Sequence, residues 1–376
     1  MNYRIKDPEQ LEELERSNYL PKPCLDIEFM ESVMEQGFNC FPERKENYVK
    51  FKSSKRSELL NYLPVKLDIE NVSRCNFRCT MCQVSDWTDN KRADDMSFND
   101  FKNLIDSQYG LVEIKLQGMG EPFLGKSYFR MIEYARARHL WVRSTTNGAL
   151  LNINDNYKRV IDADICEIQV SIDAATATTY EKIRKGGRFN KILKDCRLLN
   201  RYAKDSKRNR TRMWAVAQQN NFRELNKLPD LAADLGFDRL SITLDLNDWG
   251  QEKWRNKNDK EDVQSKIDRA MAEHIVSLGK KKDVEVTFWY IDKKFSMDSP
   301  EELCPWPFER AYISSDMRIV PCCMISNPDI YELGDARSLT KEWNNKKMLL
   351  FRRMHLSGNI PDVCKSCYYK NNRGLI

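Results

Sequence analysis

The sequence has no apolar run of the length that a membrane-spanning helix requires. No stretch approaches the about eighteen apolar residues of such a helix. The first twenty residues, MNYRIKDPEQLEELERSNYL, also lack the apolar core of a secretory signal peptide. We therefore expect a cytoplasmic protein without a membrane partner.

Strong charge of one sign is absent as well. The chain carries 62 Lys and Arg against 56 Asp and Glu, and the two signs are interleaved along its 376 residues. The basic stretch KDSKRNRTR at 204–212 is typical of a solvated connection between a helix and a strand. Charge therefore gives no reason to expect a nucleic-acid partner, and the composition, 41% apolar and 31% charged, indicates a soluble globular protein.

Histidine is scarce, with three residues in the chain, so candidate metal sites depend on cysteine. There are twelve Cys, and a reducing cytosol favours ligands and buried thiols over disulfides. Eight of them fall into two groups. The other four are scattered, and we assign them no chemistry: Cys24, Cys40, Cys166 and Cys196.

The first group places Cys75, Cys79 and Cys82 within eight residues, directly after a strand-like run at 65–70. Thiolates this dense outside a disulfide framework usually hold a metal centre. Three of them leave one iron of a cubic iron–sulfur cluster without a protein ligand. The alternative is a buried helix face with Cys at positions i, i+4 and i+7, but the intervening residues suit a buried face poorly.

Strand-like and helix-like runs alternate from Val65 onward, which predicts βαβ units and a parallel sheet. The expected strands are 65–70, 113–117, 141–145, 165–172, 212–217, 240–244 and 284–290. The expected helices are 98–107, 127–139, 177–184, 189–204, 222–235 and 261–278. Functional residues should then lie where the strands' C-terminal ends meet the loops, as the three cysteines do.

The pattern Cys75-x3-Cys79-x2-Cys82 after a first strand resembles the signature of the radical S-adenosylmethionine (SAM) superfamily. The resemblance implies an α/β fold, a partial (β/α)6 TIM-like barrel. It also implies a [4Fe–4S] cluster on the three thiolates, with the amino and carboxylate groups of SAM on the fourth iron. In that family a 5′-deoxyadenosyl radical takes a hydrogen atom from an unactivated C–H, and Met81 stands where the family places a residue against the adenine.

Polar turns after the next strands carry the resemblance further. The turn Gly118-Met119-Gly120-Glu121-Pro122 is similar to the family's "GGEP" motif, which receives the SAM ammonium group. Asn147, Ser171, Asp173 and Arg184 stand at the third and fourth strands' turns, and the resemblance implies that they contact SAM. Taken singly, an ordinary Gly/Pro turn and helix-capping residues explain these positions equally well.

The second cysteine group lies in the last eighty residues. Cys304, Cys322, Cys364 and Cys367 could form a structural zinc site by spacing alone. The surrounding sequence resembles the C-terminal SPASM/Twitch extension of radical SAM enzymes, which implies one auxiliary iron–sulfur cluster, of the [4Fe–4S] type, on these four residues. Cys323 could replace its neighbour as a ligand.

We expect three regions: an N-terminal helical extension over 1–62, the barrel over 63–297 and the SPASM/Twitch domain over 298–376. Asp7 and Asp26 are suited to begin helices in the extension. The three strands of a peptide-binding module are not evident there, so we expect a small polar substrate such as a sugar or aminocyclitol.

The expected reaction is a two-electron oxidation or an epimerisation by a SAM-dependent oxidoreductase. Asp245 or Asp248, after the sixth strand, would act as the catalytic base, although either could instead stabilise a turn. Modification of a ribosomal peptide or protein is the alternative within the class, and a zinc-binding nucleic-acid-associated protein is the alternative outside it. The resemblance also implies a reducing partner such as flavodoxin or ferredoxin.

Overall fold

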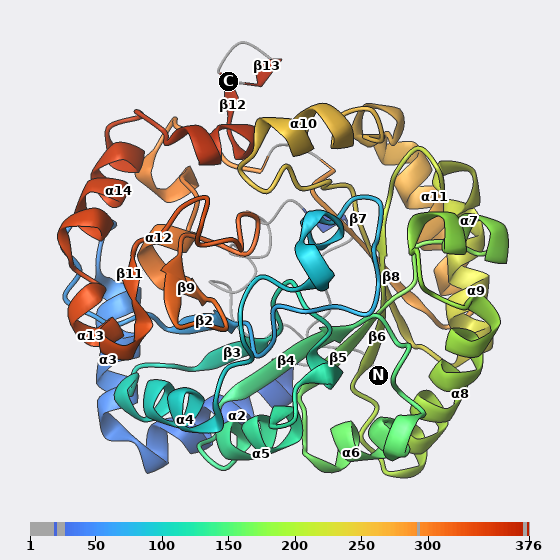
Figure 1. The fold of residues 1–376 in the computed structure, drawn as a ribbon, viewed down its shortest axis with the longest axis horizontal. Helices are drawn as coiled ribbons and strands as arrows, with labels where there is room; N and C mark the ends of the chain where they lie inside the picture. Colours follow the sequence, from blue (N-terminus) through green and yellow to red (C-terminus); the bar gives the residue numbers. More distant parts are fainter. Residues whose placement is uncertain (1–18, 21–26, 292–293, 371–373, 376) are drawn as a thin grey trace.

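The computed structural model describes residues 19–20, 27–291, 294–370 and 374–375, and Figure 1 shows a ring of helices around a curved sheet. Within these residues, seven parallel strands follow one another in chain order. They are β2 (Lys66–Ile69), β3 (Glu113–Leu116), β4 (Trp141–Thr146), β5 (Glu167–Ser171), β6 (Thr211–Val216), β7 (Arg239–Thr243) and β8 (Glu285–Trp289). All seven strands predicted from the sequence are present, and six helical crossovers join them, so the α/β partial-barrel prediction is confirmed.

Helices cover the outside of the sheet. They are α4 (Phe98–Ser107), α5 (Tyr128–Arg136), α6 (Asn156–Asp162), α7 (Ala177–Ile183), α8 (Phe189–Asp205), α9 (Leu228–Leu235), α10 (Glu252–Asn258) and α11 (Arg269–Lys280). The sequence did not predict the seven-residue helices α6 and α10, although it predicted α7, which has the same length. The last predicted helix begins later than expected, because Asp268 caps α11 by accepting a hydrogen bond from the Met271 amide at 2.8 Å.

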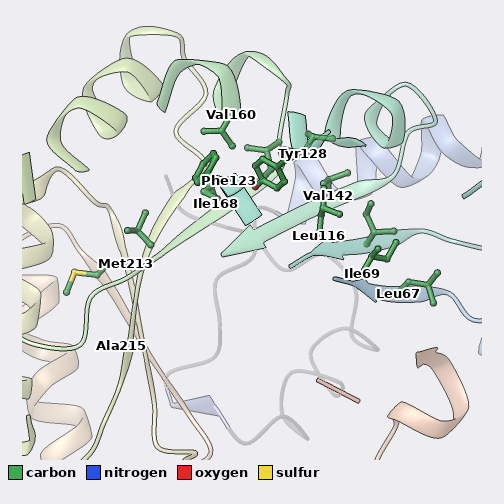
Figure 2. Close-up of a cluster of buried hydrophobic side chains, with 14 of the residues drawn as sticks. Leu67, Ile69, Leu116, Phe123, Tyr128, Val142, Val160, Ile168, Met213 and Ala215 are labelled. Atoms are coloured by element: carbon green, nitrogen blue, oxygen red, sulfur yellow. The ribbon is translucent and has the colours of Figure 1, made fainter. Parts of the chain in front are cut away.

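Alternate strand residues point to opposite sides of the sheet, and this alternation sets the two environments of the barrel. Figure 2 shows Leu67, Ile69, Leu116 and Val142 on the side that the helices cover. The residues between them face the barrel interior and are charged at its floor. There, Glu113 pairs with Lys66 at 3.8 Å and with Arg143 at 2.6 Å, and on the neighbouring strands Glu167 pairs with Arg212 at 3.2 Å.

The N-terminal helices α2 (Ile27–Cys40) and α3 (Pro42–Ser53) pack on this floor. The rings of Phe29 and Trp141, the first residue of β4, pack edge to face with their centroids 5.2 Å apart. Arg44 donates to the Arg138 carbonyl at 2.7 Å, in the turn before β4, and Asn47 exchanges two hydrogen bonds with the backbone of Leu63 before β2. The helix expected after Asp26 corresponds to α2, whereas the helix expected from Asp7 lies outside the described residues.

The C-terminal region extends the barrel sheet and lies beside β2 (Figure 1). Its strand β9 (Arg310–Ile313) pairs in parallel with β2, with Lys66 opposite Arg310 and Ile69 opposite Ile313. Its other elements are β10 (Arg318–Val320), β11 (Gly334–Asp335), β12 (Tyr369–Lys370), β13 (Gly374–Leu375), α12 (Trp306–Glu309), α13 (Leu339–Glu342) and α14 (Lys346–Leu356). At the opposite edge, β1 (Tyr19–Leu20) pairs antiparallel with β8.

None of the helices in the described part of the chain is both long enough and apolar enough to cross a bilayer.

Candidate active site

The segment with Cys75, Cys79 and Cys82 is an irregular loop at the C-terminal end of β2, so the alternative of a cysteine-bearing helix face is wrong. Backbone hydrogen bonds anchor the loop to the end of α7. The Arg78 amide donates to the Lys185 carbonyl at 2.8 Å, and the Thr80 amide donates to the Ile183 carbonyl at 2.9 Å. The three thiols are therefore held over the mouth of the barrel by the neighbouring crossover.

Hydrogen-bond donors approach the sulfur atoms of this loop. The Phe77 amide lies 3.4 Å from the Cys75 sulfur, the Asn147 amide nitrogen Nδ2 lies 3.8 Å from the same atom, and Arg184 Nη1 lies 4.0 Å from the Cys79 sulfur. Burial raises the pKa of Cys82 to about 12 and raises the pKa values of Cys75 and Cys79 above their ordinary value. Metal binding must therefore displace protons from these thiols.

The donor set fits an iron–sulfur cluster. A [4Fe–4S] cluster takes each thiolate at a separate iron, so its ligands stand farther apart than the ligands of one zinc ion. Within the described residues, no three His, Cys, Asp or Glu side chains lie close enough to share a single metal ion. Donors directed at the sulfur atoms are the contacts that tune such clusters.

The glycine turn after β3 packs directly on the cysteine loop. A Cβ atom on Gly120 would lie 2.3 Å from the Val72 carbonyl oxygen and 2.5 Å from that of Arg74, so only glycine fits. A Cβ on Gly118 would lie 2.4 Å from the Glu70 side chain. Pro122 follows, and its carbonyl accepts a hydrogen bond from Asn71 at 3.0 Å.

Glu121 is buried and joins this turn to the end of β4. Its carboxylate accepts hydrogen bonds from the Thr146 hydroxyl at 2.6 Å and from the Asn147 amide at 2.7 Å, and burial raises its pKa to about 7. Glu121 thereby fixes Asn147, whose side chain approaches Cys75. Contact of Glu121 and Asn147 with SAM stays a prediction.

Asp173 and Arg184 form a buried ion pair below the cysteine loop. Arg184 Nε lies 2.6 Å from Asp173 Oδ2, and the Val216 amide donates to the same carboxylate at 2.9 Å. Because Arg184 also approaches Cys79, the pair links the fourth-strand turn to the cysteine loop. Ser171 ends β5 and is 7% exposed. Their contacts with SAM likewise stay predictions.

The two predicted base candidates lie in the loop after β7 and are both engaged. Asp245 forms an ion pair with Lys294, whose Nζ lies 4.0 Å from the Cys367 sulfur. Asp248 accepts hydrogen bonds from the Gly250 amide at 2.9 Å and from Arg255 Nε at 3.1 Å, which closes the turn. The role of either residue as a base stays a prediction.

The same loop reaches across to the cysteine loop through contacts that the sequence did not predict, although Trp249 was expected over the barrel mouth together with Asp245 and Asp248. Trp249 Nε1 donates to the Met81 carbonyl at 3.1 Å, and Asn258 Nδ2 donates to the same oxygen at 3.3 Å. Gln83, next to Cys82, accepts from Gln251 at 3.1 Å and donates to the Ile325 carbonyl at 3.0 Å. An adenine contact of Met81 remains a prediction.

The C-terminal module brings four cysteines into one electrostatic neighbourhood. Burial raises the pKa of Cys322 most, its sequence neighbour Cys323 raises it next, and Cys364, Cys367 and Cys304 raise it further. Cys323 has a different environment. Burial raises its pKa to about 12, and the next largest effects come from Asp68 and Lys115 inside the barrel.

Glu70, also missed by sequence reasoning, connects the cysteine loop, the glycine turn and the C-terminal module. Its buried carboxylate accepts hydrogen bonds from the Met119 and Ser315 amides, each at 3.0 Å, and from the Tyr312 hydroxyl at 3.2 Å. It also pairs with Arg92 at 3.2 Å. The only signal in the sequence is its place as the last residue of the strand-like run before the cysteines.

A parallel barrel with three cysteines at its mouth and a four-cysteine module at its side defines a class of cluster-dependent enzymes. Family comparisons identify it: the radical SAM superfamily matches residues 72–225, and the iron–sulfur cluster-binding SPASM domain matches residues 304–368. The chain belongs to the radical SAM superfamily and carries a C-terminal SPASM domain.

Among curated proteins, mycofactocin maturase MftC of Mycobacterium ulcerans is 29% identical over 130 residues, 34% of each chain. The tungsten-containing aldehyde ferredoxin oxidoreductase cofactor-modifying protein of Pyrococcus furiosus is 26% identical over 186 residues, 47% of this chain and 50% of that protein. The chain thus spans between a third and half of the length of these relatives. Streptococcus suis SuiB, crystallised with its precursor peptide SuiA, shares the fold with a TM-score of 0.60 and 15% identity, over 81% of this chain and 69% of SuiB.

The family assignment supplies the cofactors: SAM with one [4Fe–4S] cluster, and auxiliary iron–sulfur in the SPASM domain. Iron–sulfur rather than zinc is therefore the C-terminal metal. Cys75, Cys79 and Cys82 would hold the first cluster, and Cys304, Cys322, Cys364 and Cys367 the auxiliary one. When bound, SAM and the first cluster would supply radical chemistry for the abstraction of hydrogen from a C–H bond.

Proposed function

We propose that the protein is a radical SAM maturase that modifies a peptide or protein. The observation that carries this proposal is the joint occurrence of the radical SAM and SPASM domains. The relative from Mycobacterium ulcerans that is similar in sequence to this chain is named a maturase. The shared fold with SuiB, a protein crystallised with a precursor peptide, supports it. The comparisons favour this alternative over the small sugar-like substrate that the sequence led us to expect.

The expectation of a small substrate depended on the N-terminal region, where the sequence shows no peptide-binding module. The described helices of this region, α2 and α3, cover the barrel floor at Trp141 and Leu63, whereas its short strand β1 pairs with the C-terminal end of β8. The two helices therefore leave the mouth to the loops and to the C-terminal module. A peptide can enter there without a separate binding domain.

The chain's own residues have distinct tasks in this reaction. Trp249 and Asn258 hold the Met81 carbonyl, so the loop after β7 fixes the cysteine loop and restricts access of water to the mouth. Asp245 holds its carboxylate beside Lys294, where it can accept a proton from an oxidised substrate. A net oxidation of the substrate is part of the same proposal.

The test is an anaerobic assay of the protein reconstituted with iron and sulfide and reduced with dithionite. We expect 5′-deoxyadenosine to form faster with one member of a panel of short synthetic peptides, together with a mass change in that peptide. The C75A/C79A/C82A variant should form none. Stimulation by free sugars or aminocyclitols, with all of these peptides inert, would refute the peptide proposal and restore the small-substrate alternative.

A further inference from the structure

Two charged side chains inside the barrel, Asp68 and Lys115, form no hydrogen bond or ion pair with any of the described residues. Asp68 on β2 lies opposite Lys115 on β3 in the parallel ladder, and both alternate with residues that face the helices, such as Leu67 and Leu116 (Figure 2). They therefore face the barrel interior. Asp68 is 7% exposed, so its carboxyl group is largely withdrawn from water.

Other charged side chains of the barrel interior, at its floor, do form ion pairs. Toward the N-terminal ends of the strands, Glu113 pairs with Lys66, and it also pairs with Arg143, which lies opposite Lys115 on β4. Burial raises the pKa of the Asp68 carboxyl, and the nearby charges of Lys115, Arg310 and Arg143 lower it. Both arginines already pair with glutamates, Arg143 with Glu113 and Arg310 with Glu309, so within the described residues Asp68 and Lys115 are left without an ion pair of their own.

The unpaired layer lies on the side where the substrate arrives. Asp68 lies opposite Tyr312 of the C-terminal module in the ladder of β2 and β9, and the Tyr312 hydroxyl donates a hydrogen bond to Glu70. Asp68 is two residues before Glu70, which connects to the glycine turn. The pair therefore stands between the two cysteine groups, beneath the mouth.

We propose that Asp68 and Lys115 form a recognition pair that binds a carboxamide side chain, that of Asn or Gln, in the peptide substrate. This inference rests on the proposed function. The pair is neutral as a whole, so a bound cation or anion alone would leave one of the two charges unpaired. A carboxamide offers N–H donors to Asp68 and a carbonyl acceptor to Lys115 on one edge.

A backbone amide cannot take the same role. Its N–H and C=O point in opposite directions in the trans peptide, so it cannot meet two neighbouring side chains at once. Aliphatic side chains would bury both charges without any compensating hydrogen bond. Among carboxamide, ammonium, carboxylate and aliphatic side chains, the carboxamide is the one that satisfies both members of the pair.

The first test measures binding to the cluster-loaded protein with SAM, under anaerobic conditions. The probes are five acetylated pentapeptides, Gly-Gly-Xaa-Gly-Gly amides with Gln, Asn, Lys, Glu or Leu at the centre. We expect the Gln or Asn peptide to bind at least about tenfold more tightly than the other three, and we expect D68N/K115M to lose this preference. The D94N variant, at an exposed aspartate, should keep it.

Several outcomes overturn the inference: a preference for Lys or Glu, equal binding of all five peptides, no binding, or a preference that survives in D68N/K115M. Equal binding leaves the peptide proposal intact. A preference for free sugars over every peptide, lost in D68N/K115M, would instead refute the peptide proposal and the carboxamide together.

The second test separates recognition from a structural role without any ligand. Because the two side chains lack partners among the described residues, D68N/K115M should unfold at the same temperature as the unmodified protein or at a higher one. E113Q, one layer below, should unfold at a lower temperature because Glu113 is paired. A drop in D68N/K115M as large as that in E113Q would show that the pair serves the fold, and the inference would fail.

Discussion

At the scale of single residues, neighbouring cysteines can have different tasks. Cys322 and Cys323 are adjacent in sequence, and spacing alone left open which of them is the auxiliary ligand. In the structure Cys322 lies with Cys304, Cys364 and Cys367, whereas Cys323 lies near Asp68 and Lys115. Their backbone directions after β10 separate them, and no pattern in the sequence shows those directions.

We predict that this difference appears in the iron content. After anaerobic reconstitution, the unmodified protein and C323A should each contain about eight irons, and C322A about four, because one cluster of four is lost. Iron and sulfide quantitation measures this, with C40A at an exposed cysteine as the control. Loss of four irons in C323A, with C322A complete, would reverse the assignment.

Other residues show why the sequence could indicate a region but not a contact. The turn with Gly120 and Glu121 was selected by its resemblance to a family motif, and it does lie against the cysteine loop. The partners of Glu121, however, are Thr146 and Asn147, twenty-five residues or more further along the chain. Contacts of that kind depend on the packing of two crossovers, which local sequence does not encode.

At the scale of elements, the strands were predictable because alternation and β-branched residues mark them. The loops after the strands were not, and they make the site. Asp248, for example, was an equal candidate for base and for turn residue, and its hydrogen bonds to Gly250 and Arg255 only emerge from the folded loop. The short helix α10, which lies in the same loop region after β7, was likewise not predicted from the sequence.

The helix α14 carries a buried histidine with a measurable consequence. His355 is 1% exposed and packs between Phe351 and Tyr368, with ring centroids at 4.7 and 6.0 Å. Its Nδ1–H donates to the Phe351 carbonyl at 2.9 Å, and Nε2 has no partner among the described residues. Burial, with a smaller effect of Arg56, lowers its pKa to about 4.

This predicts a loss of stability in mild acid. The unfolded chain binds a proton at His355 below the ordinary histidine pKa of 6.5, while the folded protein does so only near pH 4, so stability falls as the pH drops through this window. Between pH 7.5 and 5 the loss amounts to about 2 kcal/mol. Urea unfolding at several pH values measures it, and H355F should remove it.

The exposed His274 of α11 provides the matched control. H274Q should keep the full slope of stability against pH. If H355F retained the slope, or if H274Q abolished it, the buried histidine would not be its source.

At the scale of the whole molecule, the barrel and the C-terminal module form one continuous sheet. Pairing of β2 with β9 joins them through backbone hydrogen bonds, and the buried Glu70 joins them through its side chain. Arg92 strengthens this connection, since it pairs both with Glu70 and with Asp316 of the module at 2.9 Å. The relative position of the two cysteine groups therefore depends on this strand pairing and on one carboxylate at the end of the first barrel strand.

We predict that E70A loosens the module from the barrel. The substitution leaves the Met119 and Ser315 amides without their acceptor and removes one of the two carboxylates around Arg92, so the free energy of unfolding should fall by about 3–5 kcal/mol. Hydrogen exchange should rise in β9 and β10 before it rises in β3 and β4.

Glu58, which pairs with Arg353 of α14 at 2.9 Å, also connects residues on either side of the predicted boundary at 298, but both side chains are exposed. E58A should therefore lower the free energy of unfolding far less than E70A does. Equal losses in the two variants, or exchange that rises uniformly along the sheet, would show that Glu70 does not hold the junction.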